Sequence, residues 1–238
     1  LLEEMLESEG VAFRHVEVEG ETRICQTLVE PGNPEITELV EEMPPISADE
    51  WSRMVALFQS LNLSGAVVAI SGKHPAGAPV DAYAQIAKMV AGQGGRVILD
   101  APSEPLLLAL KHKPFIVKIN DVELLQTCGG NDLMAACRDL IQRGAQSVLI
   151  TRGSRSAFYV DESKTLEIFP PTIEAVNPVG SGDAVTAGMA IELSRGKDVS
   201  EAITTGMACG AANALNLLSG WIKLDDVEQL RSAVRVAS

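Results

Sequence analysis

The feature that most constrains the fold of this chain is a repeated alternation of short, continuous apolar runs with segments of helical pattern. The apolar runs cover residues 66–70, 97–99, 115–117 and 147–151. Runs this short and this apolar are typical of parallel strands that helices cover on both faces. The alternation therefore predicts an α/β domain in which a mostly parallel central sheet lies between two helical layers.

Cap and turn signals predict the remaining elements. Ser47 and Glu50 form a capping-box pattern, which predicts a helix that reaches about Leu61. Residues 157–160 and 165–169 have the pattern of a β-meander rather than of a further strand–helix unit. Further helices are expected over residues 80–90, 131–143, 183–194, 200–217 and 225–234.

Between about residues 11 and 40 the sequence predicts a small, lid-like sheet. Residues 11–19 and 22–30 alternate like two strands, and Gly20-Glu21 would join them as a hairpin. Residues 31–34 have the composition of a turn, and residues 36–40 would flank the sheet. No internal repeat or low-complexity linker divides the chain, so we expect a single domain with this lid attached.

Composition excludes several classes of function. The net charge of −13 argues against a nucleic-acid or anionic-membrane partner, because both need basic patches. The four cysteines form no C-x-x-C pair and the three histidines are scattered, which predicts reduced thiols and no metal cluster. No apolar run has membrane-spanning length, and the first ten residues lack a signal-peptide pattern. We therefore expect a cytoplasmic protein that acts on small molecules.

Residues 177–190 combine a glycine-rich turn with the start of a helix. The backbone N–H groups of Gly180, Ser181 and Gly182 can point outward together, and the helix N-terminus behind them favours negative charge. Asp183 adds a carboxylate that could take a proton from an attacking hydroxyl. An anion site beside a base is what phosphoryl transfer needs. The same residues would also fit a simple loop in which Asp183 caps its own helix.

Two common phosphate-binding motifs do not fit this turn. A Walker loop needs Gly-Lys-Ser/Thr, whereas Gly182 is followed by Asp183, and the dinucleotide fingerprint needs a small residue where Val185 stands. Residues 176–183 resemble instead the second signature of the phosphofructokinase B (ribokinase-like) sugar kinases. The resemblance implies a three-layer ribokinase-like α/β/α fold, ATP and Mg²⁺ as cofactors, and Asp183 as the catalytic base beside the anion-binding turn.

A second segment resembles the nucleotide-binding half of the same family. Lys118, Asn120 and Glu123 match a Lys-Pro-Asn-x-x-Glu-Leu motif, with Ile119 in place of Pro. The resemblance implies that the Lys and Asn lie near the nucleotide and that the Glu holds Mg²⁺ through water. Read without it, Asn120 would be a helix N-cap and Glu123 a surface acid.

Two further segments also resemble the nucleotide-binding half of this family. Thr151 and Gly153 match a Thr/Ser-x-Gly-x-x-Gly loop, which implies contact with the nucleotide phosphates and base, although Ser156 stands where a second Gly is usual. Asn213 lies on a small-residue helix that would pack under the adenine. Helix packing alone also explains Asn213.

The loop of residues 71–77 follows a predicted strand, at the edge where open α/β sheets bind ligands. It resembles a Ser-Gly-Ser-x-Pro-x-Gly segment of the 1-phosphofructokinase and tagatose-6-phosphate kinase branch. Ser71, Gly72 and Lys73, which replaces the second Ser, are therefore candidate substrate ligands. Arg23 is another candidate, because a guanidinium suits bidentate contact with phosphate. Ordinary solvated loops are the alternative for both segments.

The resemblance implies an ATP-dependent kinase of a ketohexose phosphate, of the fructose 1-phosphate or tagatose 6-phosphate kinase type, and allows a homodimer through the lid. The alternatives are ribokinase- or nucleoside-kinase-like specificity and a non-catalytic nucleotide-binding relative. The Gly-Gly-Lys-Gly segment of the family does not occur in this sequence. The resemblance therefore predicts an incomplete N-terminal part and little sugar phosphorylation by these 238 residues alone.

Overall fold

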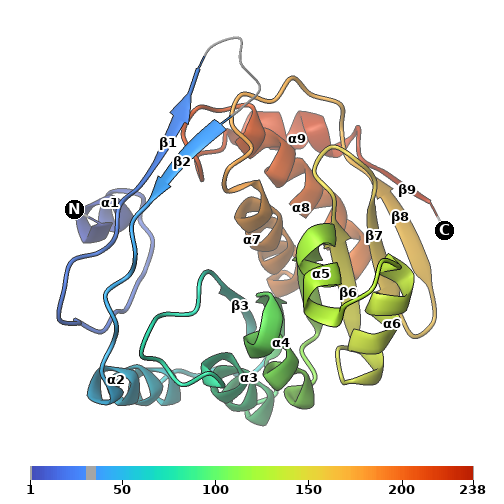
Figure 1. Ribbon diagram of the computed structural model, residues 1–238. Helices are drawn as coiled ribbons and strands as arrows, with labels where there is room; N and C mark the ends of the chain where they lie inside the picture. The colour runs from blue at the N-terminus through green and yellow to red at the C-terminus, as the bar shows by residue number, and fades with distance from the viewer. Residues whose placement is uncertain (1, 31–35, 238) are drawn as a thin grey trace.

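The computed structural model describes residues 2–30 and 36–237, and it has three layers with a sheet in the middle (Figure 1). Every strand of the seven-stranded central sheet pairs with the next one along the chain. The strands are β3 (Val67–Ser71), β4 (Arg96–Asp100), β5 (Ile116–Asn120), β6 (Ser147–Thr151), β7 (Ala157–Asp161), β8 (Thr165–Phe169) and β9 (Arg235–Ala237). The four apolar runs thus belong to one sheet, as predicted.

The sheet is mixed, with a parallel half and an antiparallel half. Strands β3 to β6 pair in parallel, whereas β6 to β9 pair antiparallel. The predicted parallel sheet corresponds to the first half, and the predicted meander to β7 and β8. Strand β3 has one neighbour within the described residues and is only partly buried, so it is not covered as fully as the sequence predicted.

Burial on both faces explains why the central strands have continuous apolar sequences. Alternate residues of a strand point to opposite faces of its sheet. One set from β4, β5 and β6 joins the core of the first helical layer: Leu99, Val117 and Ile150. The other set joins the core of the second layer: Ile98, Ile116 and Leu149.

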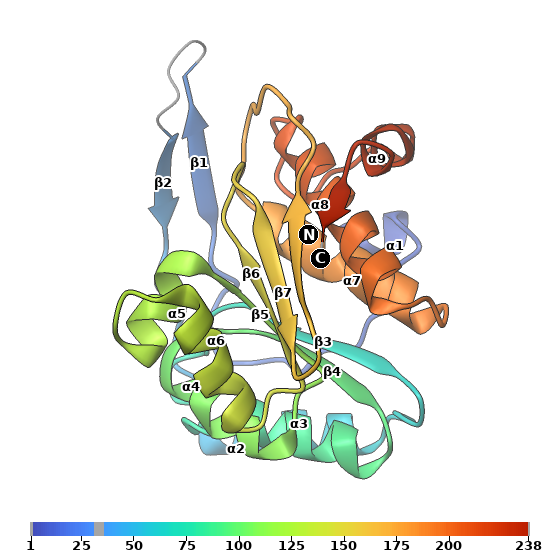
Figure 2. The same cartoon turned by 90° about the vertical axis from the view of Figure 1, so that its right-hand side faces the viewer.

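The helices form two groups on opposite sides of the sheet (Figure 2). The first group contains α2 (Ala48–Gln59), α3 (Ala82–Gly92), α4 (Ser103–Ala109), α5 (Asp121–Cys128) and α6 (Leu133–Gln142). The second contains α7 (Ser181–Ser194), α8 (Val199–Ala214) and α9 (Leu224–Arg231). In the described part of the chain, no helix is both long enough and apolar enough to cross a bilayer.

A two-stranded ribbon stands away from these layers in both views (Figures 1 and 2). It pairs β1 (Cys25–Val29) antiparallel with β2 (Ile36–Val40), and a short helix, α1 (Leu2–Ser8), precedes it. The predicted hairpin at Gly20-Glu21 is therefore wrong, because residues 11–19 form no strand and β1 pairs with β2 instead. The predicted turn at 31–34 lies outside the described residues.

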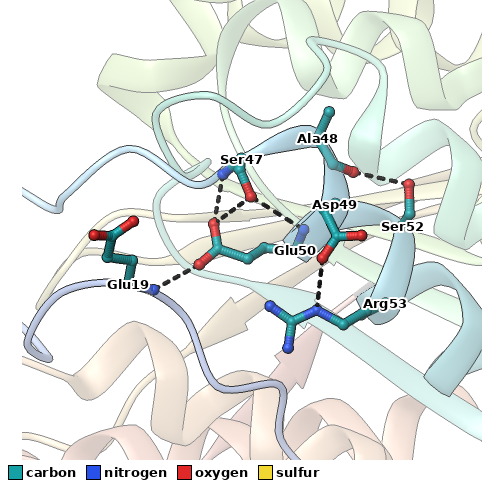
Figure 3. Close-up of polar contacts among 7 residues, drawn as sticks. All are labelled: Glu19, Ser47, Ala48, Asp49, Glu50, Ser52 and Arg53. Atoms are coloured by element: carbon teal, nitrogen blue, oxygen red, sulfur yellow. Dashed lines mark hydrogen bonds and ion pairs between the residues drawn. The ribbon is translucent and has the colours of Figure 1, made fainter.

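Residues 11–24 are instead anchored to the start of α2 through Glu50 (Figure 3). One carboxylate oxygen of this buried side chain accepts from the Glu19 N–H at 2.6 Å. The other accepts from the N–H and the hydroxyl of Ser47, at 2.6 and 2.7 Å, which confirms the predicted capping box. Hydrogen bonds from the backbone of Ser47 and then of Glu19 hold the pKa of Glu50 below its ordinary value of 4.5.

Candidate functional site

Polar side chains lie side by side where the parallel strands end. Ser71 of β3 pairs in register with Asp100 of β4, which in turn pairs with Lys118 of β5. Two residues further on, Asn120 of β5 pairs with Thr151 of β6. The carboxyl edge of the sheet therefore carries a row of hydroxyl, carboxylate, ammonium and amide groups.

The glycine-rich turn meets this edge from the second helical layer. Gly180 has φ 80°, a left-handed conformation that suits glycine, and helix α7 begins at the next residue, Ser181. The N–H groups of the first turn of a helix have no partner within that helix, so this end of α7 can bind an anion. Asp183 lies in the same first turn and is exposed.

Two buried asparagines hold the turn in place. Asn177 donates to the Leu217 carbonyl at 2.9 Å and accepts from the Val179 N–H at 3.0 Å. Asn213 donates to the Val179 carbonyl at 2.9 Å and to the Ser181 hydroxyl at 3.1 Å, and its own oxygen accepts from the Gly220 N–H. The amide of Asn213 therefore fastens the anion-binding turn to α8.

Asp183 is the carboxylate that faces the strand edge. Its Oδ1 accepts a hydrogen bond of 2.8 Å from the Ser71 hydroxyl at the end of β3. Asp100, the second carboxylate of the edge, is instead engaged with Lys118 Nζ at 2.6 Å and Thr186 Oγ1 at 3.0 Å. Of these two acids, Asp183 is the one placed to accept a proton from a bound hydroxyl.

Asn120 and Glu123 form a capping box at the start of α5. Asn120 Oδ1 accepts from the Glu123 N–H at 2.9 Å, and Glu123 Oε2 accepts from the Asn120 N–H at 3.4 Å. The N-cap interpretation of Asn120 is therefore correct as local structure. It does not exclude ligand binding, because both side chains also line the cavity described next.

These groups surround one cavity of about 750 Å³. Twelve of the fourteen site residues that the sequence predicted line it: Ser71, Gly72, Lys73, Lys118, Asn120, Glu123, Thr151, Gly153, Gly180, Ser181, Gly182 and Asp183. Arg23, which lies just before β1, and Asn213 are not among the residues that line it. Asp183 and Glu123 thus lie on the same cavity, although they come from opposite helical layers.

Three contributors to the site, Asp100, Thr186 and Asn177, were given no role in the sequence analysis, although the last two lie within the segment of residues 177–190. A signal for the first was available, since Asp100 follows a buried apolar run in the same way that Ser71 and Asn120 do. Within the described residues, no group of three or more His, Cys, Asp or Glu side chains could enclose a metal ion. Any metal here would therefore need ligands supplied by the substrate or by water.

The arrangement suits the chemistry of phosphoryl transfer. A hydroxyl placed against Asp183 would face an anion site built from the backbone of residues 180–182 and from Lys118. Residues 1–219 match the model of the pfkB family of carbohydrate kinases. The chain belongs to this family. Members of the pfkB family are ATP-dependent phosphotransferases.

Solved structures agree with this assignment. Phosphofructokinase-2 from Escherichia coli is 26% identical, with a TM-score of 0.89, and the match covers 97% of this chain and 77% of that one. A Staphylococcus aureus protein assigned as a phosphofructokinase is 28% identical, with a TM-score of 0.81 over 98% and 76% of the two chains. A Thermotoga maritima protein assigned as a 1-phosphofructokinase shares the fold, with a TM-score of 0.85 at 18% identity over 100% and 77%.

One of these relatives has also been solved with a ligand and as an assembly. The Escherichia coli enzyme has been solved with fructose-6-phosphate and in a tetrameric, inhibited form. The ribokinase-like α/β fold expected from the sequence is confirmed, with a mixed central sheet and a small two-stranded antiparallel sheet.

Proposed function

We propose that this pfkB kinase transfers the γ-phosphoryl group of Mg-ATP to a hydroxyl of a ketohexose phosphate, of the fructose 1-phosphate or tagatose 6-phosphate kinase type. The observation that carries the proposal is the convergence of Asp183, the 180–182 turn and Glu123 on one cavity. These groups come from distant parts of the chain, and each has a separate role in phosphoryl transfer.

Asp183 is the proposed general base. It would accept the proton of the acceptor hydroxyl, while the N–H groups of Gly180 and Gly182 stabilise the charge of the transferred group. The Ser181 N–H, which the sequence analysis included, already donates to the Pro178 carbonyl at 3.1 Å. The hydrogen bond from Ser71 supports this role, because it orients the carboxylate across the strand edge.

The opposite wall of the cavity is the proposed nucleotide site, formed by Lys118, Asn120, Thr151 and Gly153. Glu123 would hold Mg²⁺ through water. Its single half-exposed carboxylate fits that ion, which usually keeps several waters and binds one or two carboxylates together with substrate phosphates. Mg²⁺ would neutralise charge on the phosphates, and the protein residues would orient them.

A phosphorylated sugar is favoured over a free sugar by charge at the substrate end. Lys73 lines the cavity beside Ser71 and Gly72, and its ammonium makes an exposed ion pair of 3.6 Å with Glu42. Exposed pairs of this kind are weak, so a substrate phosphate could replace the carboxylate. Arg23 does not line the cavity, so we assign it no part in holding the substrate phosphate.

Calorimetry followed by an ATP-consumption assay tests this proposal. We expect Mg-ATP to bind, and a ketohexose phosphate to bind more tightly in the presence of a non-hydrolysable ATP analogue. Phosphorylation of free ribose or a nucleoside with no response to sugar phosphates would establish the ribokinase-like alternative. Nucleotide binding without turnover on any sugar, both by these residues and by a chain extended at its N-terminus, would establish the non-catalytic one.

We further propose that two copies associate through the ribbon. The register puts Leu28 and Leu39 on the same face of β1 and β2, and each is 53% exposed. A two-stranded ribbon is marginal in water unless another surface covers it. Light scattering of Leu39→Glu should show a monomer where the unchanged protein is a dimer, and Leu224→Glu, on α9, is the exposed control. A dimer that survives Leu39→Glu contradicts the proposal.

We also propose that the protein acts in the cytoplasm. Cys25, Cys128, Cys137 and Cys209 are all unpaired, which suits a reducing compartment.

A further inference from the structure

Gly182 is a glycine that its own backbone conformation does not require. Unlike Gly180, it has no positive φ, and it lies within the first turn of α7. A Cβ atom at this position would lie 3.1 Å from Nζ of Lys118, closer than side chains ordinarily approach one another. The missing side chain therefore lets the lysine ammonium lie against the anion-binding turn.

Lys118 is a charged residue in a buried strand. Its side chain shares a face of β5 with Ile116, part of the core next to α7, and the residue is only 4% exposed. Within the described residues, its ammonium donates to one protein acceptor, Asp100 Oδ2, at 2.6 Å. An ammonium has three protons, so the others remain available to a ligand in the cavity that Lys118 lines.

Asp100 connects this lysine to the helix that carries the proposed base. The same Oδ2 atom accepts from Thr186 Oγ1 at 3.0 Å, and Thr186 lies on α7 one turn after Gly182. The Thr186 hydroxyl is also 3.2 Å from the Gly182 carbonyl. One carboxylate oxygen therefore holds both the ammonium and the first turns of α7.

Electrostatics explains why the ammonium needs this partner. An ammonium buried alone would lose its hydration without compensation, and a carboxylate in direct contact offsets that loss. Asp100 accepts hydrogen bonds from two donors. It therefore stabilises the charge of Lys118 rather than taking part in proton transfer.

We propose that Asp100 and Thr186 are positioning residues that hold the Lys118 ammonium where it contacts the terminal phosphate of the bound nucleotide. The inference rests on the proposed kinase function, because it needs a nucleotide in this cavity. Lys118 lies against the 180–182 turn, where the transferred phosphoryl group would bind, so the network should distinguish ATP from ADP. A residue that only stabilised the fold would affect both nucleotides alike.

The test measures the Kd of Mg-ADP and of a magnesium-bound β,γ-imido analogue of ATP by calorimetry, for the unchanged protein and for two variants. Asp100→Asn removes the charge of the lysine's partner, and we expect the preference for the triphosphate to fall about tenfold with the Kd of ADP nearly unchanged. Thr186→Val keeps the side-chain shape, and we expect a smaller loss of about threefold in the same direction.

Two matched controls lie away from the cavity. Glu192→Gln removes a buried carboxylate of α7 that is paired with Arg195, at 2.8 Å. Thr204→Val removes a threonine hydroxyl that bonds to the Ser200 carbonyl within α8. Neither should change the ratio of the two Kd values, although either can lower the midpoint of thermal unfolding.

The outcomes separate the inference from the function on which it rests. If the unchanged protein prefers the triphosphate and both cavity variants keep that preference, the positioning role is wrong while the kinase proposal stands. If the unchanged protein binds neither nucleotide, both are overturned. Should Asp100→Asn fail to fold, as circular dichroism would show, Thr186→Val decides the question.

Discussion

The Ser71 hydroxyl donates a 2.8 Å hydrogen bond to the Asp183 carboxylate across 112 positions of sequence. Ser71 ends a strand, and Asp183 lies in the first turn of a helix on the second layer. The bond leaves the carboxylate exposed to the cavity while limiting its rotation. A base that is both accessible and oriented is what proton transfer from a bound hydroxyl needs.

Ser71→Ala should lower kcat about tenfold, because a hydrogen bond to a charged group contributes on the order of 1.5 kcal/mol. The KM for ATP should stay the same, since Ser71 lies on the substrate side. Steady-state kinetics with both substrates varied would check this. Ser64→Ala, in the loop before β3, is the control. A rise in the KM for ATP as large as the fall in kcat would contradict the orienting role.

Asp183→Asn keeps the size and hydrogen bonding of the side chain and removes its basicity. Turnover should fall at least ~10²-fold, the lower range for general-base catalysis. Mg-ATP should bind with unchanged affinity, because the anion site consists of backbone and Lys118. Single-turnover rates and calorimetry on the same preparation measure both quantities. Retained turnover would exclude Asp183 as the base.

Glu123→Gln should raise the Mg²⁺ concentration that gives half-maximal activity, because the amide removes the negative charge next to the ion's water shell. A Gln can still close the capping box of α5, so the midpoint of thermal unfolding should change little. A magnesium titration of activity checks this, with Glu104→Gln at the exposed start of α4 as the control. An unchanged titration would remove Glu123 from the metal site.

Glu50→Gln tests the anchor between residues 11–24 and α2. The folded pKa of Glu50 is lowered, so its ionised form contributes stability above its ordinary value of 4.5 and loses it as the pH falls through the folded pKa. The variant should therefore unfold at a lower temperature than the unchanged protein at pH 7, and the difference should shrink below pH 4.5. Thermal unfolding at both pH values measures this. Exposed Glu228→Gln should show no difference at either.

The central strands could be predicted because burial on both faces leaves a strong pattern. The N-terminal hairpin could not. Residues 11–19 alternate like a strand but find no partner strand, and a hydrogen bond from the Glu19 N–H to Glu50 holds them in an irregular path. Helix α4 was also missed, since it begins at Ser103 with a positive φ of 64° and contains a proline. Hydrogen bonds to distant residues hold both segments, at Glu19 to Glu50 and at the Ser103 N–H to Thr127 Oγ1, and local sequence does not encode such contacts.

The candidate site shows the same division. The residues of the recognised motifs line one cavity. Each motif could be found in the sequence because consecutive residues encode its turn or loop. The contact between Asp100 and Lys118 depends instead on the register of two strands and was not anticipated. Lys118 nevertheless interrupts an apolar strand that is buried. A lysine in such a strand can be detected in the sequence alone and indicates a functional role.

The order of the central sheet has a consequence for how the protein acquires activity. Neighbouring strands are consecutive in the chain, so β3 to β6 can assemble without waiting for the residues beyond them. Helix α7, which carries Asp183, follows β8 in the chain and must return to β3 at the far end of that row. Closing so long a loop is slow compared with pairing adjacent strands. During refolding, catalytic competence should therefore emerge after the sheet has formed, as a late event that spectroscopic signals of β-structure would not reveal.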